Sequence, residues 1–156
     1  MGAPTTTVRE ALVRYRGRRQ IAETVRDPAD VARFVRGIVQ NDAREHFVVL
    51  MLDGRHRPIG YQVVSVGTAT ASLVHPREVF QAAVGLGAVA LIVAHNHPSG
   101  DPSPSREDRA VTERLVRSGE LLGIRVLDSV VVAESAYHST REACPEVFER
   151  SVGQDR

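Results

Sequence analysis

The sequence predicts a single α/β domain built on a mixed β-sheet. Short apolar runs of the kind that form buried strands alternate with segments of helical periodicity, and a turn between two of these runs predicts a hairpin. Strands mixed with helices in this way indicate the α/β class. The chain of 156 residues is long enough for one domain with a substantial core and too short for two of ordinary size. Its apolar content of 42% and charged content of 25% are ordinary for a globular protein.

The N-terminal part predicts a basic segment followed by a helix. Residues 1–26 lack a clear pattern and contain the basic run 13–20, so we expect a basic N-terminal segment ahead of the domain. Asp27-Pro28 marks a helix start, because proline is favoured at the first helical position. The apolar face of this helix appears at helical spacing and comprises Val31, Phe34, Val35, Ile38 and Val39.

A hairpin is predicted next. Residues 47–52 form an apolar run typical of a buried strand, and residues 59–66 return after a turn that begins at Asp53-Gly54. The small and polar residues 67–72 predict a loop after the second strand.

A second helix, a buried strand and a third helix follow. Pro76 begins the second helix, and the fully apolar run 88–94 predicts the strand. The third helix is expected over residues 106–118, with Gly119 and Gly123 marking its end.

The last elements complete the domain. We expect a strand over residues 124–133 and a short strand near Tyr137, which places the domain at residues 27–142. The remaining residues 143–156 are expected to form a polar, partly disordered tail.

The segment between the buried strand and the third helix carries the main functional signal. His95 and His97 lie two residues apart, so both imidazoles can leave the same face of the sheet. Asp108 follows at the start of the helix, which gives the spacing H-x-H-x(7)-S-x(2)-D with Ser105 between. Two histidines and one aspartate predict a metal site of the catalytic type, in which zinc keeps a fourth position open.

The same residues have a purely structural interpretation. Ser105 and Asp108 have the spacing of a capping box at a helix start, and Pro104 also fits such a start. The two interpretations are compatible, because one helix end can cap itself and face a metal. Asp101, a carboxylate in the loop, is an alternative to Asp108 as the third ligand.

This spacing resembles the JAMM motif of MPN-type metallohydrolases, and the string HNHPSGDPSPSRED resembles the version found in the RadC-like family. The resemblance covers residues 28–142 and extends to three further segments in the same order, REHFVVLMLD, VGTATASLVHPREVFQAAV and LLGIRVLD. It implies the MPN fold, a curved sheet flanked by helices.

The resemblance also implies roles for individual residues. Zinc on His95, His97 and Asp108 would activate water, Glu45 would act as the general base, and Ser105 would help to stabilise the oxyanion of amide or isopeptide hydrolysis. The local sequence alone does not favour Glu45 over Glu107 or Glu113.

The other histidines are interpreted separately. His75 belongs to the family pattern and is either a partner of a ligand or a helix-capping or core residue. His46 is expected to be structural, and His56 and His138 to lie at the surface. The chain departs from the family at Asp128-Ser129, where relatives commonly have Asp-His. Metal binding should survive this change, because that histidine is not a motif ligand.

Two other functions compete with hydrolysis. The RadC name carries an association with DNA repair, and relatives usually have a helical DNA-binding region before this domain. About forty residues precede Glu45 here, too few for that region, and the net charge of +1 predicts at most weak nucleic-acid binding. The second alternative is a non-catalytic MPN module that binds a partner. Such modules typically lose the ligands, whereas this chain keeps every motif position.

Cellular context is indicated by a few absences in the sequence. The single cysteine, Cys144, excludes an internal disulfide and fits a reducing compartment. The sequence has neither an N-terminal signal segment nor an apolar run long enough to cross a membrane. We therefore expect a cytoplasmic protein that acts on a peptide or protein substrate without a membrane, and the sequence leaves open whether it is a monomer or a dimer.

Overall fold

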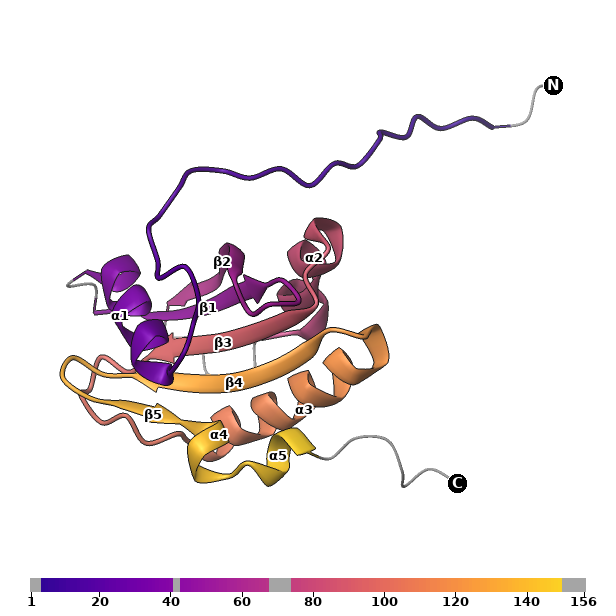
Figure 1. The fold of residues 1–156 in the computed structure, drawn as a ribbon. Coiled ribbons are helices and arrows are strands. Elements are labelled where there is room, and N and C mark those ends of the chain that lie inside the picture. The colour runs from indigo at the N-terminus through magenta and orange to yellow at the C-terminus, as the bar shows by residue number, and fades with distance from the viewer. Residues whose placement is uncertain (1–3, 41–42, 68–73, 150–156) are drawn as a thin grey trace, which may run out of the picture.

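The computed structural model describes residues 4–40, 43–67 and 74–149 (Figure 1). Five helices and five strands lie in this part of the chain. In chain order they are α1 (Pro28–Val39), β1 (Glu45–Leu52), β2 (Pro58–Gly67), α2 (Pro76–Leu86), β3 (Ala90–Asn96), α3 (Arg106–Leu122), β4 (Arg125–Val132), β5 (Tyr137–Ser139), α4 (Thr140–Ala143) and α5 (Glu146–Glu149).

The strands form one mixed sheet in the order β2-β1-β3-β4-β5. β1 pairs antiparallel with both β2 and β3, and β4 pairs antiparallel with β5. β3 and β4 run parallel because α3 carries the chain back between them. The predicted α/β class, mixed sheet and hairpin are therefore confirmed.

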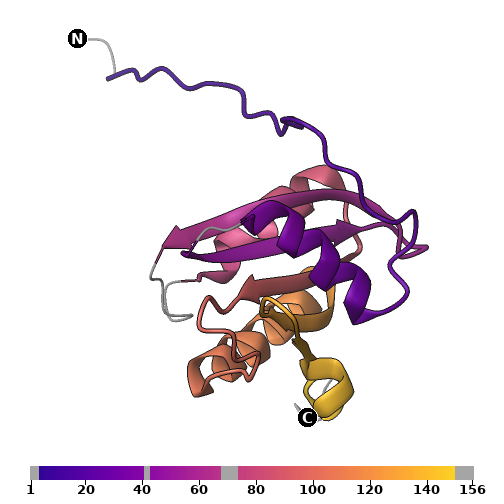
Figure 2. The ribbon, with the colours of Figure 1, turned by 90° about the vertical axis from the view of Figure 1, so that its left-hand side faces the viewer.

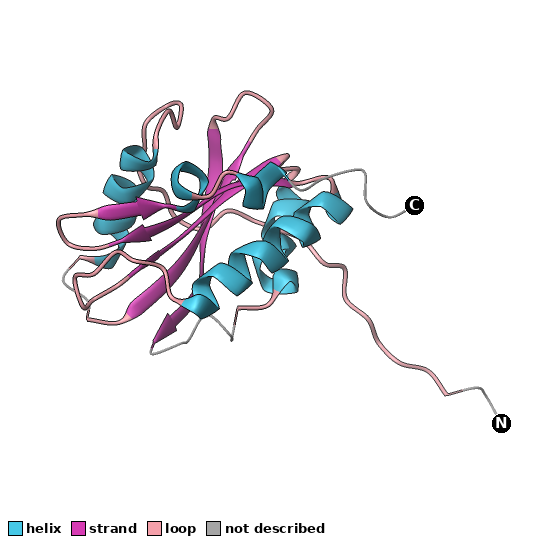
Figure 3. Cartoon of the chain, turned by 90° about the horizontal axis from the view of Figure 1, so that it is seen from below, coloured by secondary structure: helices cyan, strands magenta, loops and turns pink. Residues whose placement is uncertain are grey.

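Helices cover both faces of the twisted sheet (Figure 3). On one face, α1 packs against alternate residues of the three central strands, including Val48, Ile92 and Val130. On the other face, α2 and α3 pack against the intervening residues, such as Val49 and Val93. Because side chains alternate along a strand, an almost wholly apolar strand such as β3 can serve both cores.

The predicted helix starts are confirmed. The Asp27 carboxylate accepts a hydrogen bond from the Asp30 N–H at the start of α1, and Pro28 occupies the first turn. α2 begins at Pro76, after His75. At the start of α3, Ser105 and Asp108 form both hydrogen bonds of a capping box.

Of the two glycines predicted to mark the end of α3, Gly123 does so, whereas Gly119 lies within the helix and the predicted end at residue 118 was wrong. The helix continues through Gly119 to Leu122 and ends at Gly123, which adopts a left-handed conformation with φ of 69°. Gly119 is buried, and a Cβ at this position would collide with the Ile124 carbonyl oxygen and press against the Phe80 ring. The glycine therefore permits close packing rather than ending the helix.

The fold also continues further towards the C-terminus than the sequence indicated. Where a tail from residue 143 was expected, the chain forms α5, and Phe148 is buried in the core that also contains side chains of α2 and α3. The Arg141 guanidinium lies over the Phe148 ring at 5.6 Å from its centroid. The packed fold thus reaches at least Glu149.

The segment before α1 has neither helix nor strand over residues 4–26, and it leads away from the sheet (Figures 1 and 2). Its later part is tied to the domain, because Arg19 donates hydrogen bonds to the Tyr61 hydroxyl and the Gly37 carbonyl. The loop predicted over residues 67–72 falls, after Gly67, outside the described residues. None of the helices in the described ranges is long and apolar enough to cross a membrane.

Candidate metal centre

The topology places the carboxyl end of β3, the amino end of β1 and the amino end of α3 at the same edge of the sheet. His95 lies near the carboxyl end of β3, and His97 follows directly after this strand. Because β1 is antiparallel to β3, the amino end of β1, with Glu45, lies beside them. The loop after β3 leads into α3, whose first turn carries Asp108. The predicted site residues thus meet although Glu45 is far from the others in sequence.

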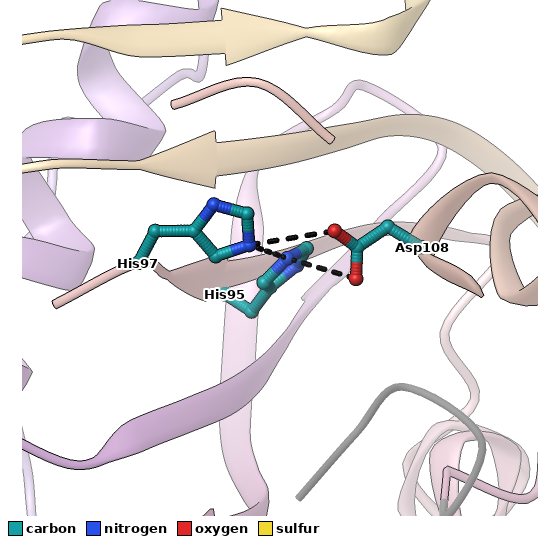
Figure 4. A group of neighbouring side chains, drawn as sticks. All are labelled: His95, His97 and Asp108. Atoms are coloured by element: carbon teal, nitrogen blue, oxygen red, sulfur yellow. Dashed lines mark hydrogen bonds and ion pairs between the residues drawn. The ribbon is translucent and has the colours of Figure 1, made fainter. Parts of the chain in front are cut away.

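His95, His97 and Asp108 form a compact group in which the side chains point toward one another (Figure 4). The two Nε2 atoms of the histidines are 3.1 Å apart. His95 Nε2 lies 3.2 Å from Asp108 Oδ1, and His97 Nε2 lies 3.4 Å from Asp108 Oδ2. These atoms face a common point, so they can hold a metal ion.

The spacing of these atoms suits zinc. In tetrahedral coordination with bonds of about 2.0–2.1 Å, neighbouring ligand atoms are separated by about 3.3 Å. The 3.1 Å between the two Nε2 atoms is close to this value, and each histidine lies at a similar distance, 3.2 or 3.4 Å, from a different oxygen of the Asp108 carboxylate. Two imidazoles and one carboxylate are also a donor set that zinc accepts and that leaves a position for water.

The orientation of His97 is fixed by the loop. Its Nδ1–H donates to the Asp101 carbonyl oxygen at 2.9 Å, and this bond assigns the tautomer with an unprotonated Nε2 directed at the group. Asp101 therefore contributes through its backbone. Its carboxylate accepts from the Ser103 N–H and is not part of the metal group, so the alternative of Asp101 as the third ligand is not supported.

His95 is held mainly by packing. The residue is buried, and its imidazole lies nearly parallel to the Phe47 ring, with centroids 6.1 Å apart and planes inclined by 10°. Within the described part of the chain, no donor or acceptor reaches His95 Nδ1. The ring is thus directed by its apolar neighbours and by Asp108, in contrast to the backbone bond of His97.

The Asp108 carboxylate is fixed in orientation and favoured in its ionised form. Its Oδ2 accepts a hydrogen bond of 2.7 Å from the Ser105 N–H, which fixes the carboxylate at the start of α3. Burial opposes its ionisation, but the contacts with His95 and Ser105 outweigh this effect, so the pKa of Asp108 lies well below its ordinary value. The helix N-terminus also favours a negative charge here. The capping interpretation is therefore confirmed, and the capped geometry is compatible with a ligand role for Asp108.

Glu45 lies next to the group without being part of it. Its Oε1 is 3.8 Å from His97 Nε2, and its side chain is about one-third exposed. The pairing of Phe47 with His95, extended by two residues, places Glu45 opposite His97 on the same sheet face. Antiparallel pairing of β1 with β3 is the signal that distinguishes Glu45 from Glu107 and Glu113, which are exposed on α3.

A small cleft opens beside the metal group. Its walls combine polar site residues with apolar side chains and are formed by Glu45, His46, Phe47, Ser65, Val74, His95 and Asp108. Ser105 occupies the N-cap position of α3, and its Oγ accepts from the Asp108 N–H at 3.0 Å. A hydroxyl oxygen that accepts still has its proton to donate.

The remaining histidines lie as follows. His46 is buried and its Nδ1 is 3.0 Å from the Arg44 carbonyl oxygen, in agreement with a structural role. His75 precedes α2 and is exposed, without a side-chain capping bond. His56 is exposed in the hairpin turn, whereas His138 on β5 is partly buried. Ser129, where relatives commonly have histidine, is buried in β4, and the metal group forms without it.

Fold and site together define a JAB/MPN-type domain with a group of side chains that could hold a metal ion. The chain belongs to the family of RadC-like JAB domains, which matches residues 25–145. It is 50% identical over 116 residues to a UPF0758 protein of Symbiobacterium thermophilum, which covers 74% of this chain and 50% of that protein. A UPF0758 protein of Rubrobacter xylanophilus is 49% identical over 118 residues, which make up 76% of this chain and 52% of that protein. The chain thus spans about half the length of the curated relatives it matches.

Proposed function

We propose that this domain is a zinc-dependent hydrolase of amide or isopeptide bonds. The observation that carries the proposal is the position of Glu45, a carboxylate beside the metal group but outside it. A site that only stored or sensed a metal has no need of such a group. An acid–base residue next to an open metal position is the arrangement of a metallohydrolase.

The metal and the chain have separate tasks in this proposal. A zinc ion held by His95, His97 and Asp108 would act as a Lewis acid and lower the pKa of water to about 7. Glu45, in the wall of the cleft, would accept a proton from the attacking water and pass it to the leaving nitrogen. Its partial exposure keeps the carboxylate accessible to both.

Ser105 would supply the donor that the oxyanion requires. Carbonyl attack places negative charge on oxygen, and a fixed donor stabilises that charge more than mobile water does. The hydroxyl oxygen is held in place because it accepts the Asp108 N–H, and its proton remains available to donate to the oxyanion. We therefore assign Ser105 to oxyanion stabilisation.

The residues that line the cleft and the charge of the chain favour a peptide-like substrate over nucleic acid. The cleft walls include Phe47 and Val74, which suit a peptide-like substrate. A nucleic-acid role is the second candidate, because Arg14, Arg16 and Arg18 are exposed along the extended N-terminal segment. We favour the peptide-like substrate for two reasons. The arginines lie on the N-terminal segment and not among the residues that line the cleft, and the net charge of the whole chain is only +1. A cytoplasmic location fits both candidates.

The test begins with metal analysis of purified protein. It continues with cleavage assays on peptide, isopeptide and nucleic-acid panels, each with and without a chelator and with Glu45→Gln as the matched inactive variant. Chelator-sensitive cleavage of peptide or isopeptide substrates that Glu45→Gln abolishes is the expected result. Cleavage confined to nucleic acid would replace the proposal with the second candidate.

A further inference from the structure

Asn96, between the two histidines, makes contacts that metal binding does not explain. It is the last residue of β3 and only 6% exposed. Its Oδ1 accepts a 2.6 Å hydrogen bond from the His46 N–H, and its Nδ2 donates to the Arg44 carbonyl oxygen at 2.9 Å. These two groups belong to the two peptide bonds of Glu45, one before it and one after it.

The backbone course explains why a side chain is needed here. Backbone pairing of β1 with β3 ends at Phe47 and His95. Beyond Asn96 the chain continues along β4, where the His97 N–H donates to the Val132 carbonyl at 2.8 Å. A carboxamide has the same donor and acceptor as a peptide group, so Asn96 continues the pairing of β1 after the β3 backbone has left it.

The consequence concerns the direction of the Glu45 side chain. The two peptide groups of a residue determine where its Cα–Cβ bond points, and Glu45 is the first residue of its strand. On the opposite side, β1 is paired with β2 through Glu45 and Gly67. With β2 on one side and the Asn96 carboxamide on the other, Glu45 is held like a residue in the middle of a sheet.

We propose that Asn96 is the positioning residue of the general base, holding the Glu45 carboxylate within reach of the metal group through both of its peptide bonds. This inference rests on the proposed function, in which Glu45 transfers the proton. A displacement of about 1 Å in a reacting group can lower a rate by about a hundredfold. Loss of the carboxamide should therefore reduce turnover while leaving the three metal ligands in place.

The central experiment compares Asn96→Leu, which keeps the approximate shape and removes both hydrogen bonds, with Asn96→Asp, which keeps the acceptor for His46. For Asn96→Leu, kcat should fall by about ten- to a hundredfold with little change in KM and with full zinc content. Asn96→Asp should recover part of the loss. The matched control is Gln62→Leu, the same amide-to-alkyl change in β2 at a residue whose Oε1 has no partner within the described ranges.

A double-mutant cycle separates positioning from general damage. If Asn96 acts through Glu45, then Asn96→Leu in the Glu45→Gln background should cause no further loss. Equal fold-losses in both backgrounds, unchanged kcat, or loss of zinc from Asn96→Leu would overturn the inference. If Asn96→Leu does not fold, Asn96→Asp replaces it in the double-mutant cycle with Glu45→Gln. The same outcomes then support or overturn the inference.

A second measurement does not depend on hydrolysis. In metal-free protein, Asn96→Leu should speed hydrogen exchange of the His46 amide and lower the NMR order parameter at Glu45, with little change in the other strands. Unchanged values would reject the inference even if the enzyme assignment holds. A wild-type protein that is inactive on every substrate would reject the proposed function, and the NMR values would then decide the positioning contact alone.

Discussion

Glu45 and His97 face each other across the end of the β1–β3 pairing, with Glu45 Oε1 3.8 Å from His97 Nε2. One residue belongs to the metal group and the other does not. Under the proposed function, the metal group would hold an ion and Glu45 would move a proton, so substitutions should separate the two roles.

Replacement of His97 should remove the metal. We expect about one zinc per wild-type chain and a large loss in His97→Ala, because two remaining protein ligands bind zinc weakly. Elemental analysis after dialysis measures this directly. The control is His56→Asn, an exposed site with φ of 57° that asparagine tolerates. Equal zinc in wild type and His97→Ala would refute the assignment of the ligands.

Replacement of Glu45 should leave the metal and remove the activity. Glu45→Gln preserves the shape of the side chain but cannot accept the proton, so the rate should fall by about 10²–10⁴-fold. Zinc content and the thermal unfolding midpoint should stay close to wild type. Glu107→Gln and Glu113→Gln, on the exposed face of α3, are the controls. If Glu45→Gln loses zinc as fully as His95→Ala does, Glu45 is a ligand.

Nucleic-acid binding should be weak and strongly dependent on salt. Replacement of Arg14, Arg16 and Arg18 by glutamine should reduce the slope of log K against log salt by about 0.9 for each phosphate that the protein no longer neutralises. Titration of labelled single- and double-stranded DNA over a salt series measures the slope, with Arg125→Gln as an exposed control on β4. Tight binding that persists at physiological salt, or strand cleavage that Glu45→Gln abolishes, would favour the nucleic-acid candidate.

Asp128 should make the stability of the domain depend on pH. It is buried and accepts hydrogen bonds from the Ser139 hydroxyl and from the Ser129 and Arg141 N–H groups. Burial raises its pKa above the ordinary 3.8, although these bonds oppose the shift. The folded state therefore binds the proton more tightly than the unfolded state. Its stabilising contribution is complete below the unfolded pKa and is lost as pH rises through the folded pKa.

Denaturant unfolding of metal-free wild type and Asp128→Asn tests this dependence between about pH 4 and pH 7. Wild type should gain stability relative to Asp128→Asn as the pH falls, because the amide has no charge to neutralise. Asp128→Ala, which removes all three bonds, should be less stable than either by about 1–3 kcal/mol. A stability difference between wild type and Asp128→Asn that does not change with pH would contradict the raised pKa.

Local patterns predicted most of the fold, and the exceptions have physical reasons. Helix starts at Asp27-Pro28 and Ser105 were evident because capping depends on adjacent residues. The prediction of a helix end at Gly119 was wrong, since the role of this glycine arises from contact with Phe80 and Ile124, which no local pattern reveals. Phe148 was assigned to a tail because a lone aromatic in a polar stretch does not show where it packs.

For the site, the sequence supplied the residues within one short segment. His95, His97 and Asp108 are close in the chain, and their spacing indicated a metal group that the structure brings together. Glu45 required either a family resemblance or knowledge of strand pairing. The carbonyl of Asp101 and the carboxamide of Asn96 could not be anticipated, because both act through hydrogen bonds to particular positions that depend on the folded chain.

The closeness of the three ligands in the chain also has a consequence for folding. Residues 95–108 span only the end of β3, one loop and the first turn of α3, so an ion bound there would close a short loop at a small entropic cost. Such an ion would link the start of α3 to the end of β3. Because it would bind the folded state and not the unfolded state, it would shift the folding equilibrium toward the native state by mass action. Metal supply would then control how much of the protein survives in folded form, in addition to whether the protein is active.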